Sequence, residues 1–202
     1  MIMNCCNHTH PYDDFDVQGR WQPSQLRCLI IGENPGGLES AYFYDPPENY
    51  QKDPVIVRKG LLSTLSELKL LYTPTLEGFR QAGFLFDHAI RCPMTREDIR
   101  RERQAAQRYK AARVQKPDHL RRAIAHASIV WVMGHLACNA VANLTNEFSK
   151  KQRRISAHPY PGYDEPESRF FVSEYLTWRN KKKWTNIGSA FAQFARLRWD
   201  WA

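Results

Sequence analysis

The chain lacks the features that mark a membrane, secreted or repetitive protein. No apolar run approaches the roughly 20 residues that a transmembrane helix needs, and Met1–Cys6 lack the charged head and apolar core of a signal peptide. No internal repeat, low-complexity tract or Gly/Ser-rich linker divides the sequence. We therefore expect a soluble, cytoplasmic monomer with a single domain over residues 1–202, of which 1–25 form an irregular N-terminal extension.

Cysteine is scarce and unevenly placed. The five cysteines are an odd number at irregular spacing, which argues against a disulfide framework and is typical of a reducing compartment. They are Cys5, Cys6, Cys28, Cys92 and Cys138. A zinc site made by Cys5, Cys6, His8 and His10 would be crowded, so we predict no metal site.

Acidic residues are in deficit. There are 29 Lys and Arg against 21 Asp and Glu, which gives a formal net charge of +8. Such an excess over a whole domain is typical of proteins that bind a polyanion, although charge that serves only solubility is the alternative. The basic residues gather in three stretches, at 96–122, 150–154 and 179–183.

What the sequence does contain is the pattern of an α/β protein. Four short apolar runs predict strands at Arg27–Ile31, Phe84–Ile90, Ser128–Met133 and Arg154–Ala157. The first and third do not alternate with polar residues, as expected of parallel strands that are covered on both faces. Helices are predicted between the strands, at Val57–Leu71, in a long basic segment that opens near Thr95, and at Ala137–Phe148. We expect a three-layer α/β/α fold with a central, mostly parallel four-stranded sheet.

Two loops are predicted to bring polar residues to the carboxyl edge of that sheet, where parallel sheets bind ligands. The first strand runs into Gly32–Glu39, a glycine-rich turn that would direct Glu33 and Asn34 into the crevice. A plain strand–helix turn and a phosphate-binding loop are the alternatives, but neither G-x-G-x-x-G nor G-x-x-x-x-G-K-[ST] is present. The last predicted strand runs into Ile155–Gly162, where His158 precedes a proline, and a hydrogen-bonded structural histidine is the alternative there.

Four segments in order resemble the uracil-DNA glycosylase superfamily. Leu29–Glu39 is similar to its first motif, which reads G-E-A-P-G-x-x-E in the iron–sulfur branch and G-I-N-P-G or G-M-N-P-G in the mismatch-specific and single-strand-selective branches. Ala157–Pro161 resembles the second motif, H-P-S-P. Two strands between them, Phe86–Pro93 and Ile129–His135, resemble the family's Y-I-T-N-V-V-K-C-R-P strand and its strand that ends in L-G.

The resemblance implies a DNA glycosylase that removes uracil or another deaminated base in DNA repair. It implies Glu33, Asn34 and His158 as catalytic residues, and a base-binding pocket made by Gly32, Pro35, Gly36, Glu39, Phe43, Tyr44 and His88. For Phe43 and Tyr44, core packing is the alternative to stacking on a base. DNA phosphates and the gap left by a flipped nucleotide would be contacted by Tyr160, Lys151, Arg153, Lys181, Lys182 and Lys183.

The sequence departs from the family in two places. His88 stands where the family has an asparagine that pairs with uracil, and an imidazole offers a different set of donors and acceptors. Cys92 matches only one ligand of the family's iron–sulfur cluster, so we predict no cofactor. A non-catalytic protein that binds damaged or single-stranded nucleic acid on the same fold is therefore the alternative function.

Overall fold

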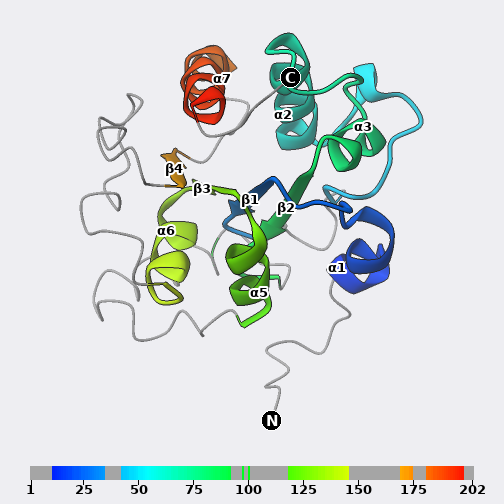
Figure 1. Ribbon diagram of the computed structural model, residues 1–202. Coiled ribbons are helices and arrows are strands. Elements are labelled where there is room, and N and C mark those ends of the chain that lie inside the picture. The colour runs from blue at the N-terminus through cyan, green and yellow to red at the C-terminus, as the bar shows by residue number, and fades with distance from the viewer. Residues whose placement is uncertain are drawn as a thin grey trace.

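The computed structural model describes residues 11–34, 42–91, 97, 100, 118–145, 169–174 and 181–197. In this part of the chain one sheet contains β1 (Cys28–Gly32), β2 (Phe84–His88), β3 (Ile129–Met133) and β4 (Phe170–Ser173). The strands are all parallel and lie in the order β2-β1-β3-β4. Figure 1 shows this sheet between two groups of helices.

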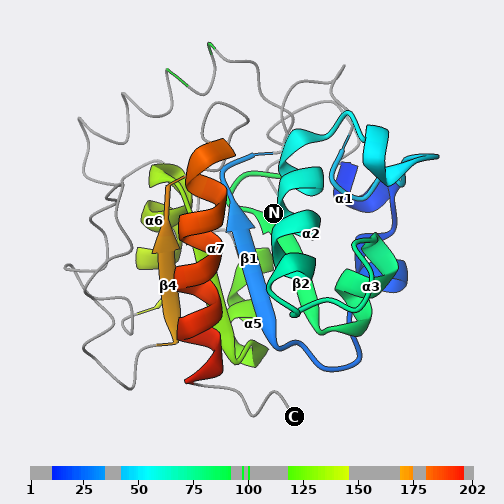
Figure 2. The same cartoon turned by 90° about the horizontal axis from the view of Figure 1, so that it is seen from above.

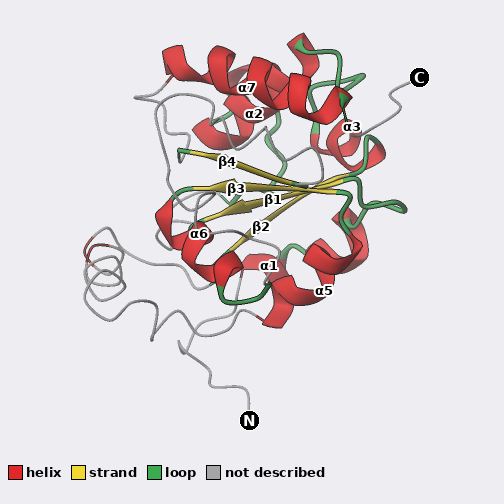
Figure 3. Ribbon diagram, turned by 60° about the vertical axis from the view of Figure 1, so that its left-hand side comes forward, coloured by secondary structure: helices red, strands yellow, loops and turns green. Residues whose placement is uncertain are grey.

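The helices form the two outer layers. One face of the sheet carries α2 (Ile56–Glu67), α3 (Leu76–Gln81) and α7 (Lys181–Arg196), and the other carries α1 (Pro11–Asp14), α5 (Asp118–His126) and α6 (His135–Ala142) (Figure 3). Two short turns complete the described elements, the π-helical η1 (Val17–Trp21) and the 3-10 helix η2 (Tyr50–Lys52). The predicted three-layer α/β/α fold is thus confirmed, and no helix in the described ranges combines the length and apolarity that a bilayer span requires.

Three of the four predicted strands are confirmed within one or two residues. Every residue of β1, β2 and β3 is buried, which explains why β1 and β3 read as apolar runs without alternation. The fourth described strand, β4, was not predicted, and the predicted strand Arg154–Ala157 lies outside the described residues. β4 holds only four residues, at one edge of the sheet, so its apolar signal in the sequence is short.

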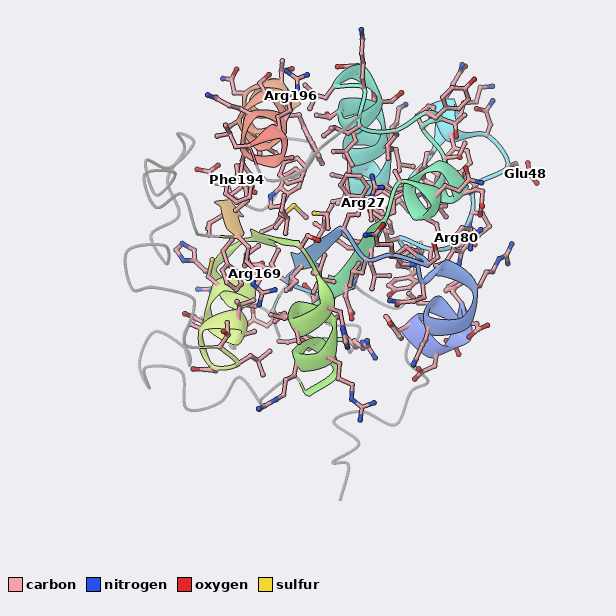
Figure 4. All side chains as sticks on the ribbon, in the orientation of Figure 1. Arg27, Glu48, Arg80, Arg169, Phe194 and Arg196 are labelled. Carbon is pink, nitrogen blue, oxygen red and sulfur yellow. The ribbon has the colours of Figure 1, made fainter. Side chains whose placement is uncertain are left out.

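The edge strand β4 and the helix α5 are fixed by polar contacts as well as by packing. The indole Nε1 of Trp131 donates to Oγ of Ser173 at 2.9 Å, from β3 to β4. Arg169, just before β4 (Figure 4), donates from Nη1 to the carbonyl oxygens of Ile124 and Ala127 at 2.6 and 2.8 Å. Both carbonyls lie at the end of α5. Such a cation satisfies carbonyl groups that the end of a helix leaves unpaired.

The predicted helix Val57–Leu71 is confirmed as α2, and its end has a clear cause. Lys69 takes the left-handed conformation with φ of 60°. The N–H of Leu70 then donates back to the carbonyl of Leu65 at 2.9 Å, as in a Schellman cap. Leu70 and Leu71 leave the helix but remain buried, so the leucine pattern continues past the helix itself.

Residues 11–21 contribute to the core of the fold. Within the expected irregular extension over 1–25, residues 11–14 and 17–21 form α1 and η1, and residues 1–10 lie outside the described residues. Tyr12, Val17 and Trp21 are buried in the core, and the Trp21 ring stacks on Tyr44 at 5.8 Å. The partners of Trp21 and Tyr12 are Tyr44 and Arg91, which are distant in the sequence, so a local pattern does not reveal these contacts.

Candidate functional site

The carboxyl ends of β1 and β2 bring the first and middle motifs together. The two strands are in parallel register with Gly32 opposite His88. The pairing continues past the strands, because the N–H groups of Ala89 and Ile90 donate to the carbonyls of Gly32 and Glu33 at 2.8 and 3.0 Å. Glu33, Asn34 and His88 therefore lie at one edge of the sheet, as the sequence predicted.

The strand order makes this edge a switch point. β1 leads to α2 on one face of the sheet, whereas its neighbour β3 leads directly to α6 on the other face (Figure 3). Chains that leave two adjacent parallel strands in opposite directions leave a crevice between them, which is where such sheets bind ligands. The residues that follow β1 thus stand at the place where chemistry is expected.

Glu33 spans this switch point and caps a helix. Its Oε1 accepts the backbone N–H of Leu136 at 3.3 Å, in the first turn of α6. Gly134, the residue just before α6, has φ of 91°, and a Cβ at this position would lie 2.6 Å from Oε1 of Glu33. A glycine is needed for both reasons, and α6 has no capping side chain of its own. The Glu33 carboxylate fills that role and complements the positive end of the helix.

Asn34, the next residue, is buried without being satisfied. It is 7% exposed, and its Nδ2 finds no hydrogen-bond acceptor in the part of the chain that the structure describes. An unpaired buried donor costs about 1–3 kcal/mol, so such groups in a folded protein call for an explanation such as a ligand. Of the two polar residues after β1, Glu33 stabilises the fold by capping α6, whereas Nδ2 of Asn34 can donate to a ligand.

His88 ends β2 in an aromatic setting. It is 3% exposed, its ring meets the Phe86 ring edge-on at 4.9 Å, and the Tyr42 ring lies 5.8 Å away. Gly32 allows this approach, because a Cβ there would come within 2.9 Å of Phe86 and 3.4 Å of His88. The role of Gly32 is therefore to let the end of β2 pack closely over β1.

The two predicted base-stacking residues are part of the core. The Phe43 ring, 3% exposed, stacks on Phe86 at 4.3 Å. Tyr44 is 1% exposed, and its Oη accepts the backbone N–H of Phe86 at 2.7 Å. Because β2 is an edge strand, this bond satisfies a group that the sheet leaves unpaired. For Tyr44 the core-packing alternative accounts for what the structure shows. Tyr42, which was not singled out from the sequence, is an aromatic neighbour of His88 together with Phe86.

A buried arginine holds this aromatic segment in place. Arg58 of α2, 1% exposed, pairs with Asp53 through Nε at 2.5 Å and Nη2 at 2.6 Å. Its Nη1 donates to the carbonyls of Tyr42 and Phe43 at 3.0 and 2.8 Å, and also to that of Asp45. A signal for Arg58 existed in the sequence, since it lies three residues before Leu61 on the apolar stripe of α2, where a charge needs a buried partner.

A second arginine–aspartate pair flanks His88. Asp87, 1% exposed, accepts from Nε and Nη2 of Arg91 at 3.1 and 2.7 Å and from the backbone N–H of His88 at 2.7 Å. The Arg91 guanidinium lies over the Tyr12 ring, 3.2 Å from its centroid. This cluster ties α1 to the end of β2, and the sequence analysis named none of its members.

The phenols around the cluster are held in their neutral form. Burial, with a smaller effect of Asp87, raises the pKa of Tyr12 to about 12. The pKa of Tyr42 is also raised, well above its usual range, first by burial and then by Asp87. Burial lowers the pKa of Arg91, but its hydrogen bonds to Asp87 and the attraction of that charge outweigh this and leave it raised. The arginine therefore stays charged at any physiological pH.

The remaining predicted residues lie outside the described part of the chain. They are Pro35, Gly36, Glu39, Lys151, Arg153, His158 and Tyr160, together with the side chains of Lys181, Lys182 and Lys183. The backbone of the three lysines forms the first turn of α7, which lies at the end of the sheet to which the strands point (Figure 2). The described part of this basic stretch, residues 181–183, thus starts at the same edge as Asn34 and His88.

Metal ligands do not gather in the described residues. No three His, Cys, Asp or Glu side chains in these ranges are grouped as a metal ion would require. Cys28 and Cys138 are buried, and burial raises the pKa of the Cys28 thiol. Cys5, Cys6 and Cys92 fall outside the described residues, so the absence of an iron–sulfur cluster stays a prediction.

Comparisons with protein-family models, with curated proteins and with solved structures find no match to this chain. The site must therefore be judged on its own residues. Glu33 caps α6 at the switch point, Asn34 has a buried amide donor without a described acceptor, and His88 lies among aromatic rings.

Proposed function

We propose that the chain is a monofunctional DNA glycosylase, which hydrolyses the N-glycosidic bond between a flipped, damaged base and its sugar. The observation that supports it best is the buried Nδ2 of Asn34, which has no acceptor among the described residues and lies at the sheet edge shared with His88. Leaving this donor unpaired is costly unless a ligand accepts from it. A base or a water molecule in the crevice would supply that acceptor.

The chemistry follows from the charges that develop. A base inside a duplex cannot be reached, so it is extruded into the crevice, at a cost of a few kcal/mol that is smallest for damaged bases. As the glycosidic bond breaks, negative charge grows on the base and positive charge on the sugar. In this proposal His158 hydrogen-bonds the departing base anion, the Asn34 amide orients the attacking water, and His88 reads the edge of the base. Glu33 positions Asn34 and His88 by fixing the end of β1 to α6.

DNA reaches this crevice through basic groups. The first turn of α7, with Lys181, Lys182 and Lys183 in its sequence, starts at the carboxyl edge of the sheet. Together with Lys151 and Arg153, these residues would neutralise phosphates on either side of the flipped nucleotide. No lysine is assigned as a Schiff-base nucleophile, so the strand stays intact after base release.

The test is a base-release assay with purified protein. Oligonucleotides that contain a single uracil, hypoxanthine or xanthine, or a thymine mismatch, are offered as single and double strands. We expect one of them to yield a free base and an abasic strand that breaks only on treatment with alkali. If the protein binds these strands but releases no base from any of them, the non-catalytic nucleic-acid binder replaces this proposal.

A further inference from the structure

The two arginine–aspartate pairs near the site differ in their hydrogen bonds and in their exposure. In Arg58, all three guanidinium nitrogens are used, two by Asp53 and the third by three backbone carbonyls. In Arg91, Nε and Nη2 are used by Asp87. The Tyr12 side chain also interacts with this guanidinium, but among the described residues Arg91 lacks the backbone carbonyl acceptors that Arg58 has. The side chain of Arg58 is 1% exposed, whereas that of Arg91 is 21% exposed. The first pair is complete and the second has an open edge.

The open edge of Arg91 is held rigidly in position. The bidentate pair with Asp87 fixes the plane of the guanidinium, and the Tyr12 ring lies against its flat face at 3.2 Å. An arginine whose geometry is set in advance loses little side-chain freedom when it binds a second anion. The Asp87 carboxylate is 1% exposed, so the accessible part of this ion pair is its cationic half.

Position decides which anion would meet this edge. Arg91 follows β2 by three residues, at the carboxyl end of the sheet, and Asp87 also accepts the backbone N–H of His88. A group bound by Arg91 thus lies at the same end of β2 as the residue proposed to read the base. The anion that accompanies a base in a strand is the phosphodiester of its own or the adjacent nucleotide, and arginine forks suit phosphate oxygens.

We infer that Arg91 binds a backbone phosphate of the nucleic-acid strand beside the target nucleotide, and that Asp87 and Tyr12 position it for this contact. The inference rests on the proposed function for the identity of the strand, and it adds a binding residue outside the basic stretches. The contact requires neither a change of fold nor a loss of the Asp87 pair, since Nη1 alone supplies two N–H donors.

The chain offers a matched control. Arg80 on the outer surface of α3 makes a similar bidentate pair, with Glu77, at 3.1 and 2.6 Å (Figure 4). It lies before β2 and hence toward the amino end of that strand, away from the site. The double variant Glu77→Gln with Arg80→Gln removes one negative and one positive charge and is the control. The double variant Asp87→Asn with Arg91→Gln removes both members of the Asp87–Arg91 pair, leaves the net charge unchanged and avoids a buried unpaired carboxylate.

The experiment measures binding of a fluorescent single-stranded oligonucleotide with one uracil over a range of salt concentrations, alongside the melting temperature. We expect the double variant Asp87→Asn with Arg91→Gln to bind about tenfold more weakly at physiological salt, with the slope of log affinity against log salt reduced by about 0.7. The control double variant, Glu77→Gln with Arg80→Gln, should leave the slope unchanged. An unchanged slope in a folded Asp87→Asn, Arg91→Gln variant, or an equal reduction in both double variants, would overturn the inference.

Two further arms separate the alternatives. If inorganic phosphate at millimolar concentration saturates the wild-type protein and Arg91→Gln abolishes this binding, Arg91 serves free phosphate and the strand contact is wrong. Base release is measured on the same samples. An Arg91-dependent slope without any base release would contradict the glycosylase proposal alone, whereas base release with an unchanged slope would contradict only the role of Arg91.

Discussion

Neighbouring polar residues at the end of β1 have opposite uses, and the difference lies in their hydrogen bonds. Glu33 gives its carboxylate to the N-terminus of α6, and Asn34 keeps an amide donor with no acceptor among the described residues. A group that lowers stability unless a ligand is present is typical of a functional site. A substitution of Glu33 is therefore expected to change mainly stability, and a substitution of Asn34 mainly activity.

Replacing Glu33 tests whether its role is structural. Glu33→Ala removes the cap of α6, and we expect a loss of about 0.5–2 kcal/mol in the free energy of unfolding. Glu33→Gln keeps an oxygen acceptor and should restore most of that loss, measured by urea denaturation. If Glu33 only positions the site, Glu33→Gln also retains most of the base release. A folded Glu33→Gln variant that has lost base release would instead assign the carboxylate to the chemistry.

Base preference is expected to depend on His88. His88→Asn supplies the carboxamide that the resembled family uses to pair with uracil, with more donors than a neutral imidazole. We expect the ratio of uracil release to hypoxanthine release to rise in this variant, measured under single-turnover conditions. Tyr72→Phe, at a ring that is 99% exposed, is the control and should leave the ratio unchanged. A ratio unaltered in a folded His88→Asn variant would show that His88 does not contact the base.

At the scale of elements, the site depends on a segment that has no regular structure. Residues 42–45 follow the first motif and present Tyr42 to His88 and Tyr44 to the edge of β2. Arg58 in α2 donates to the carbonyls of Tyr42, Phe43 and Asp45, and Asp53 pairs with Arg58. Helix and loop therefore form one unit, joined by a charge pair that is excluded from water.

Removing one member of this pair should be costly. Arg58→Ala leaves Asp53 buried without its partner and removes the donor to three carbonyls of the segment 42–45, so we expect a loss of about 3–5 kcal/mol in the free energy of unfolding. Arg80→Ala, which breaks an exposed pair, should cost at most about 1 kcal/mol. Both are measured as free energies of unfolding. Similar losses in the two variants would mean that Arg58 does not organise the segment.

For the whole molecule, the sequence predicted the layers and the strand ends better than the links between distant residues. Apolar runs identified β1, β2 and β3, because strands covered on both faces need continuous hydrophobic residues. Motif order placed Asn34 and His88 at one edge, which parallel pairing of β1 with β2 guarantees. The contact of Arg91 with Tyr12 could not be predicted, since it joins segments almost 80 residues apart without a local pattern.

Alkaline pH should weaken the fold as a whole. The unfolded chain releases the Tyr12 proton near pH 10, whereas in the folded protein its pKa is raised to about 12. The resulting stabilisation is fully present below pH 10 and is lost as the pH rises toward 12. Tyr12→Phe should therefore show a shallower fall in unfolding free energy over this range, measured by denaturant titration at pH 9 to 11.5. An identical fall would contradict the burial of Tyr12 against Arg91.

The central claim is that Asn34 serves chemistry at a cost to the fold, and one measurement tests it most directly. Single-turnover base release and the free energy of unfolding are compared for the wild type and Asn34→Ala, with Asn49→Ala as the matched control. Asn49 is satisfied, since its Oδ1 accepts from the N–H of Gln51 at 2.8 Å. We predict that Asn34→Ala slows base release by about 10²–10³-fold, with stability unchanged or raised. Asn49→Ala should lower stability by about 1 kcal/mol and leave the rate unchanged. An Asn34→Ala variant that releases base at the wild-type rate, or one that is strongly destabilised, would contradict the account.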